Sequence, residues 1–161
     1  MIQDADLEYD PQDYLKICEA FDRNGTQAVF GARFNEFSKS LFLRRWFLNS
    51  FCGKKYEIKR FHHFFGIQFL NALANLLYAA RITDEATCYK AFKKDLLDKI
   101  ELRCTGFEFC PEIIAKVRKA GVAITEVPVS YHPRTKLEGK KLNWKHGFEA
   151  AFTLIKYRFV D

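Results

Sequence analysis

The chain alternates short apolar runs with longer helical patterns, and this alternation constrains its fold more than any single motif. Residues 28–30 form a short apolar run typical of a buried strand. Residues 122–131 are rich in β-branched side chains, and Pro128 among them suits a sheet edge or a bulge. No apolar run approaches the roughly 18–20 residues that a transmembrane helix requires. We therefore predict one mixed α/β domain that does not span a membrane.

Helical patterns fill most of the rest of the chain. They cover residues 14–22, 61–80, a segment after the loop at 82–85, 108–120 and 144–160. The pattern at 61–80 places Phe65, Phe69, Leu73 and Leu76 at helical spacing, which predicts an apolar face. The helix expected after the loop at 82–85 contributes four side chains to the predicted core: Tyr89, Phe92, Leu96 and Leu97.

Ring content and charge are the unusual features of the composition. The chain has 17 Phe, 7 Tyr and 2 Trp in 161 residues, which is more ring surface than a small core needs. We therefore expect some rings to face a lipid surface or a partner. The net charge of +6 suits phosphate-bearing ligands, an anionic membrane or nucleic acid. A nucleic-acid-binding domain is the weakest of these interpretations, because no DNA- or RNA-binding motif accompanies the charge.

The cysteines and histidines argue against a structural metal or a disulfide framework. Five cysteines are present, an odd number, and no two have CxxC spacing. The four histidines form no HExxH pair. A reducing compartment is therefore the favoured interpretation, and we expect a cytoplasmic protein.

Two carboxylates at the start of the chain are candidates for metal binding. In Asp4-Ala5-Asp6, the side chains at i and i+2 share one face if the segment is extended, so both can bind one hard cation. Mg²⁺ or Mn²⁺ bound there would take phosphate oxygens as further ligands. Taken alone, the motif is weak, and a solvated acidic turn is the favoured interpretation.

Two basic features are candidates for phosphate binding. Arg33 follows the apolar run and a glycine, where its planar guanidinium suits a phosphate. In isolation, a surface arginine with a packed stem is favoured. Residues 134–141, RTKLEGKK, form a basic loop with a glycine that suits a diphosphate, and an ordinary solvated loop is equally compatible with this sequence.

The order of the motifs is more specific than any one of them. The segments QDADLEYDPQDY, VFGAR, ITDEATCYKAF, GFEFCPEIIAKV, ITEVPVSYHPR and EGKKLNWKHGFEA follow one another through residues 2–158. Together they resemble the C-terminal half of family 2 glycosyltransferases of the dolichyl-phosphate mannose synthase and polyprenyl-phosphate glycosyltransferase group. The resemblance implies a partial GT-A fold over residues 1–161, lacking the N-terminal Rossmann-like strands.

The resemblance also implies a function and a site. The reaction would be metal-assisted transfer of a hexose, such as mannose or glucose, from a nucleotide-diphosphate sugar to a polyprenyl or dolichyl phosphate. In the implied site, Asp4 and Asp6 bind Mg²⁺ or Mn²⁺ and, together with Glu8, Arg134 and Lys140, the nucleotide diphosphate. The acceptor phosphate is bound by Arg33, Arg44 and Arg45. The implied catalytic residues are Asp84, which borders the donor sugar, and Arg134.

The residue types agree with this chemistry. A polyprenyl phosphate is already an anionic nucleophile near neutral pH, so the reaction needs charge neutralisation and positioning more than a general base. If the acceptor were a hydroxyl, Asp84 or Glu85 would serve as the base.

Two departures from the group bear on the function. The group's N-terminal half is absent, so we expect either a partner chain that supplies it or an inactive homologue that binds lipid or a partner. Residues 34–60 are longer than expected and mix rings with basic side chains. We predict an interfacial segment there, with Phe42, Trp46 and Phe47 in the headgroup region. A core-covering helical hairpin is equally compatible. The expected location is the cytoplasmic membrane surface, as a peripheral protein.

Overall fold

The computed structural model describes residues 1–2, 8–23, 25–33, 61–132 and 144–160. In this part of the chain the helices are α1 (Asp13–Phe21), α4 (Phe61–Tyr78), α5 (Lys94–Leu97), α6 (Phe109–Lys119) and α7 (Trp144–Phe159), and the strands are β1 (Ala28–Ala32), β2 (Lys90–Phe92) and β3 (Ile124–Pro128). The described residues therefore form the mixed α/β arrangement that the sequence predicts. None of their helices is both long and apolar enough to cross a membrane.

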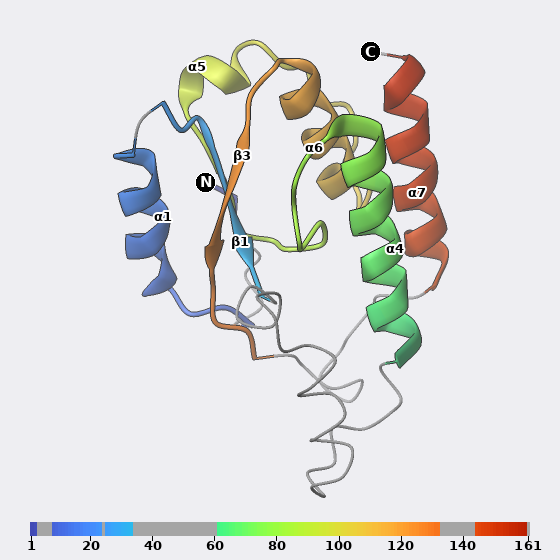
Figure 1. The fold of residues 1–161 in the computed structure, drawn as a ribbon, viewed down its shortest axis with the longest axis horizontal. Helices are drawn as coiled ribbons and strands as arrows, with labels where there is room; N and C mark the ends of the chain where they lie inside the picture. Colours follow the sequence, from blue (N-terminus) through green and yellow to red (C-terminus); the bar gives the residue numbers. More distant parts are fainter. Residues whose placement is uncertain (3–7, 24, 34–60, 133–143, 161) are drawn as a thin grey trace, which may run out of the picture.

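A three-stranded sheet lies between two layers of helices. The strand order is β2-β1-β3, with β1 parallel to β3 and antiparallel to β2. Helix α1 covers one face of the sheet, and α4, α6 and α7 lie on the other side (Figure 1). The predicted edge position of Pro128 is confirmed within this sheet, because β3 pairs with β1 alone among the described strands.

The central strand β1 is buried on both faces, which explains its uniformly apolar sequence. All five of its residues are buried. Because side chains alternate along a strand, Phe30 packs into the core formed with α4, α6 and α7, whereas Val29 packs into the core formed with α1.

The segment after the loop at 82–85 differs from its prediction. We expected a helix with Tyr89, Phe92, Leu96 and Leu97 in the core, and this prediction is wrong in part. Residues 90–92 form strand β2, because they pair with β1 in the register Val29↔Ala91. Only the short helix α5 follows, and Leu97 is exposed on it, whereas Tyr89 and Leu96 are fully buried.

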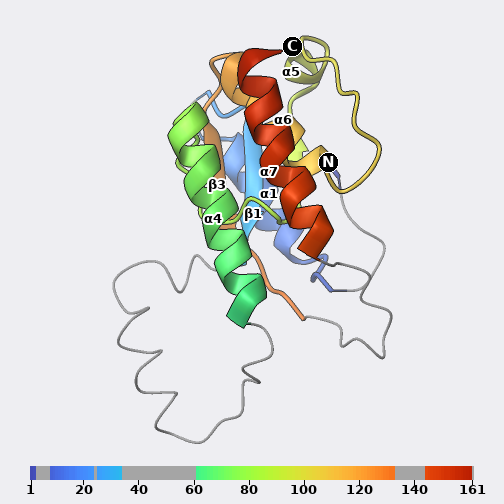
Figure 2. The ribbon, with the colours of Figure 1, turned by 90° about the vertical axis from the view of Figure 1, so that its right-hand side faces the viewer.

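Helices α4 and α7 lie side by side and run in the same direction (Figure 2). The Tyr78 hydroxyl joins them by donating to the Leu154 carbonyl oxygen at 2.6 Å. The face of α4 that packs inward carries Leu70, Ala74 and Tyr78. Phe65, Phe69 and Leu76, which the sequence placed on one apolar face, are exposed instead.

Gly31 in β1 gives a direct test of this packing. A methyl group there would lie 2.9 Å from both Val129 methyl carbons and 3.0 Å from the Tyr89 Cβ. We predict that Gly31→Ala lowers the free energy of unfolding by about 1–3 kcal/mol, because the strand is already tightly packed. Urea denaturation of the two proteins measures the difference.

Gly66 provides the matched control. It lies in α4 with open space around its Cα, so Gly66→Ala should raise the free energy of unfolding by roughly 0.5–1 kcal/mol. Equal stability of Gly31→Ala and the wild type would contradict the close approach of β1 to Tyr89 and Val129.

Candidate functional site

The candidate site lies where the parallel strands β1 and β3 end. Ala32 and Pro128 are partners in the register, so the residues that follow them, Arg33 and 129–131, leave the sheet side by side. In open α/β sheets, ligands bind outside the carboxyl ends of the strands. The chain therefore brings a cation to the position in the fold where a ligand site is expected.

Arg33 forms a nearly buried ion pair with Asp84. Its backbone N–H and its Nε donate to Asp84 Oδ2 at 2.9 and 2.7 Å, and its Nη2 donates to Oδ1 at 2.7 Å. The side chains are 8% and 0% exposed. Burial by itself lowers the pKa of the Arg33 guanidinium, but the hydrogen bonds and the charge of Asp84 raise it above its ordinary value. The guanidinium is therefore permanently charged and held in one orientation.

Strand β3 and helix α4 hold the loop that carries Asp84. Glu126 of β3 accepts the Thr83 backbone N–H and hydroxyl, both at 2.8 Å, and the Asp84 N–H at 3.2 Å. Asn71 of α4 donates to the Thr83 carbonyl oxygen at 2.6 Å and accepts the Glu85 N–H at 2.7 Å. The position of the Asp84 carboxylate is thus fixed from two elements that are distant in sequence.

Tyr131 connects Arg33 to Glu8, and Tyr9 packs against Tyr131. The Arg33 guanidinium lies over the Tyr131 ring, 4.8 Å from its centroid, and the Tyr131 hydroxyl donates to Glu8 Oε2 at 3.1 Å. The Tyr9 ring stacks on the Tyr89 ring with 4.6 Å between their centroids, and its centroid lies 5.3 Å from that of the Tyr131 ring. Burial raises the pKa of Tyr131 to about 12, with Arg33 opposing and Glu8 reinforcing the shift. Tyr131 is therefore neutral and acts as a hydrogen-bond donor.

An open pocket of about 160 Å³ lies beside Arg33. It is lined by Lys16, Ala32, Arg33, Pro128, Val129 and Ser130. Lys16 pairs with Asp13 at 2.6 Å, and the other Asp13 oxygen accepts the Ser130 N–H at 2.6 Å. The pocket therefore carries two cations, each paired with a carboxylate, and N–H donors of these types suit an oxyanion such as a phosphate.

Lys90 and Glu85 form a second polar group beneath the loop. Lys90 is fully buried, and its Nζ donates to the carbonyl oxygens of Glu85 and Thr87 while it lies 5.0 Å from the Phe30 ring centroid. The Glu85 Oε1 atom has no hydrogen-bond partner within the described part of the chain. Burial raises the pKa of Glu85 to about 7, and the charge of Lys90 opposes this shift.

The structure brings some of the predicted site residues together. Arg33, Asp84 and Glu8 belong to one connected cluster, although Arg33 and Glu8 meet through Tyr131 rather than directly. The other predicted site residues lie outside the described residues: Asp4, Asp6, Arg44, Arg45, Arg134 and Lys140. The segment at 34–60, predicted to be interfacial, lies outside them as well.

Sequence reasoning assigned no role to Glu126 or Lys90. The signal that would have found them is a charged side chain inside an otherwise apolar strand. Lys90 is buried and Glu126 is half-buried, and a charged side chain is removed from water only with partners, which both have here.

The predicted metal site rests on residues beyond the described ones. No group of three His, Cys, Asp or Glu side chains in the described ranges could hold a metal ion. Of the described carboxylates in the cluster, Asp84 is bound by Arg33, and Glu8 accepts from Tyr131. The pair Asp4 and Asp6 fits a hard divalent cation in its chemistry, because carboxylate oxygens complemented by water and phosphate are the ligands that Mg²⁺ prefers.

Glu85 predicts a specific dependence of stability on pH. The unfolded carboxyl loses its proton near pH 4.5, whereas the folded one keeps it until about pH 7. The unfolded state then binds fewer protons in this window, so the free energy of unfolding falls as the pH rises, on the order of 3 kcal/mol in total. Glu85→Gln cannot ionise at this position, so its free energy of unfolding should not show this decrease between about pH 4.5 and pH 7.

The measurement is urea denaturation of both proteins between pH 4 and pH 8. The exposed Glu19 of α1 supplies the control, and Glu19→Gln should follow the wild-type curve. Parallel curves for the wild type and Glu85→Gln across this range would show that the buried carboxyl does not titrate there.

Comparison with known proteins relates part of this chain to a hexosyltransferase. Over 88 residues, which are 53% of this chain and 21% of the relative, the chain is 30% identical to a low-salt glycan biosynthesis hexosyltransferase of Haloferax volcanii. The matched stretch is thus about a fifth of that protein's length. The chain matches no protein-family profile. No solved structure matches it. The similarity supports a relationship to glycosyltransferases.

Proposed function

We propose that this protein transfers a hexose from a nucleotide-diphosphate sugar to a polyprenyl phosphate. The observation that carries the proposal is the fixed guanidinium of Arg33 on an open pocket at the carboxyl ends of β1 and β3. The similarity to a hexosyltransferase over half of the chain supports the same reaction class. Mannose and glucose are the donor sugars that we favour.

In this proposal, the pocket beside Arg33 receives the acceptor phosphate. Arg33 and Lys16, each already paired with a carboxylate, would donate hydrogen bonds to the phosphate oxygens, and Arg44 and Arg45 would supply the positive field. A phosphate oxygen is already anionic near neutral pH, so it attacks the sugar without a general base. Asp84 then acts as a positioning residue, because its carboxylate accepts hydrogen bonds from the Arg33 backbone N–H and guanidinium and so fixes the guanidinium on the pocket.

The donor diphosphate would lie at the start of the chain. Asp4, Asp6 and Glu8 are proposed to bind it together with Arg134 and Lys140. Asp4 and Asp6 would also hold Mg²⁺ or Mn²⁺, which when bound neutralises charge on the leaving nucleoside diphosphate. Glu8 accepts a hydrogen bond from Tyr131, and the Tyr131 ring contacts Arg33, so this part of the proposed donor site is connected to the proposed acceptor site.

Because the acceptor is a lipid, we place the reaction at the cytoplasmic membrane surface, with the protein bound peripherally. A partner chain that supplies a nucleotide-binding half is a further part of the proposal. Nucleic acid is not a proposed partner.

Transfer of labelled sugar into the organic phase tests the proposal. The full chain is incubated with polyprenyl phosphate in detergent, a panel of nucleotide hexoses and Mg²⁺, with EDTA in parallel. We expect incorporation that EDTA abolishes and that Asp4→Asn with Asp6→Asn lowers by about 100-fold or more. Arg33→Lys should lower it by about tenfold or more, because an ammonium lacks the guanidinium fork.

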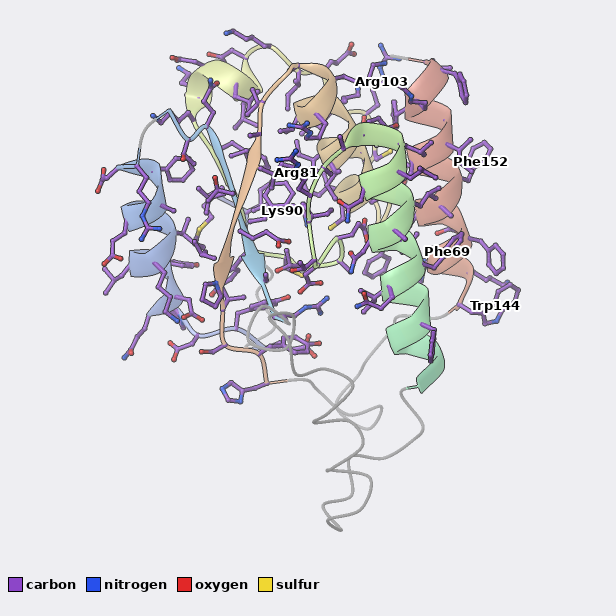
Figure 3. The ribbon with its side chains drawn as sticks, viewed as in Figure 1. Phe69, Arg81, Lys90, Arg103, Trp144 and Phe152 are labelled. Carbon is purple, nitrogen blue, oxygen red and sulfur yellow. The ribbon has the colours of Figure 1, made fainter. Side chains whose placement is uncertain are left out.

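Arg103→Gln is the matched control for Arg33→Lys. Arg103 is an exposed arginine at the end of the molecule opposite the carboxyl ends of β1 and β3 (Figure 3). Its loss should leave incorporation unchanged. No Mg²⁺-dependent transfer from any donor, by a chain that still binds polyprenyl phosphate, would reject the proposal in favour of an inactive lipid-binding homologue.

A further inference from the structure

Helices α4 and α7 both carry exposed rings. We call this set the aromatic face. Its members are between 54% and 82% exposed: Phe65 and Phe69 of α4, and Trp144, Phe148, Phe152 and Phe159 of α7. Trp144 and Phe152 project from the outer side of α7 in Figure 3, away from the sheet. Exposed apolar surface on this scale marks a site of interaction.

The aromatic face is separate from the packed faces of the same helices. Ala150, Leu154 and Tyr157 of α7 pack into the core, as Ala74 and Tyr78 of α4 do. The rings of α7 recur at intervals of four or seven residues, so they form one outward stripe. A helix on the surface of a globular protein normally turns a polar face outward. Both helices instead carry apolar residues inward and outward, which indicates that the outer face has an apolar neighbour.

Charge around the face identifies that neighbour. Helix α4 has no Asp, Glu, Lys or Arg among its 18 residues. Helix α7 has three cations, Lys145, Lys156 and Arg158, against one carboxylate, Glu149, which gives +2 with His146 neutral. Rings beside lysine and arginine are typical of helices that lie in the headgroup region of an anionic membrane.

We propose that the aromatic face docks on the surface of an anionic phospholipid bilayer, with α4 and α7 lying in the interface. The rings enter the headgroup and upper acyl region, and the α7 cations meet anionic headgroups. The first turns of both helices point to the end of the molecule at which β1 and β3 terminate (Figure 1). The pocket at Arg33 lies at that same end, and its lining includes Lys16 of α1 from the other side of the sheet. The docking is inferred from the aromatic face and the charges beside it, and it does not rest on the proposed function.

Vesicle flotation of the full chain tests the docking. The vesicles contain phosphatidylcholine alone or with 30 mol% phosphatidylserine (roughly the content that gives a strong surface potential), and neither polyprenyl phosphate nor nucleotide sugar is present. We expect flotation with the anionic vesicles that falls with added salt. Phe148→Ser with Phe152→Ser should lower the partition coefficient roughly tenfold or more. Lys156→Glu with Arg158→Glu should remove the preference for anionic lipid.

Leu15→Ser is the matched control. Leu15 is 69% exposed on α1, on the opposite side of the sheet, and its replacement should leave flotation unchanged. Circular dichroism checks that each variant folds. The Trp46→Phe variant keeps every residue of the aromatic face and leaves Trp144 as the one tryptophan in the sequence, so its fluorescence reports on that face. Brominated anionic lipids should quench its fluorescence.

Three results would overturn the inference: equal flotation of the wild type and the double serine variant, absence of quenching at Trp144, or self-association through this face. The last would appear as a dimer in size-exclusion chromatography that the serine variant abolishes, without flotation. Transfer to detergent-solubilised acceptor without flotation would reject the docking and retain the proposed function. Flotation without transfer would reject the proposed function and retain the docking.

Discussion

Arg33 and Asp84 are 51 residues apart in the chain, and in the fold they share three hydrogen bonds in a nearly solvent-free setting. Removing two charges from water is costly, and the attraction compensates only when the geometry is good and the remaining polar atoms are satisfied. Here the bidentate fork and the backbone N–H meet that condition. The pair ties the end of β1 to the loop at 83–85, and Glu126 and Asn71 hold that loop against β3 and α4. The pair orients the Arg33 side of the pocket, whereas Asp13 orients the other side by pairing with Lys16 and accepting the Ser130 N–H.

Packing, ligand binding and surface contact are assigned to different parts of the molecule. The sheet needs close approach at Gly31, and β1 is filled with apolar residues. Polar chemistry is left to the residues just beyond the strand ends, where Arg33 and Ser130 line the pocket. The outer surfaces of α4 and α7 contribute to neither, which is why their rings are available for a lipid surface. In our proposals both features bind lipid: the pocket binds the phosphate of the acceptor, and the aromatic face binds the bilayer.

The parts of the fold that the sequence predicts well are those set by local pattern. The apolar run predicted as a strand at 28–30 corresponds to β1, and the helical pattern at 108–120 corresponds to α6, within one or two residues at each end. Strand β2 was missed because it has three residues and includes the charged Lys90, and only pairing with β1 defines it. The exposure of Phe65 and Phe69 was missed because helical spacing alone does not distinguish two apolar faces. Arg33 and Asp84 were each singled out, but their contact depends on tertiary structure that no local pattern encodes.

The central claim, that the Arg33–Asp84 pair organises the site, is tested most directly by a double-mutant cycle of unfolding free energies for Arg33→Met and Asp84→Asn. Each single change leaves buried polar or charged groups without their partner, so each should destabilise the protein strongly, by about 3 kcal/mol or more. The double variant should then be destabilised by at least about 2 kcal/mol less than the sum of the two. Additivity to within about 0.5 kcal/mol would show that the two side chains contribute independently, and would contradict the account.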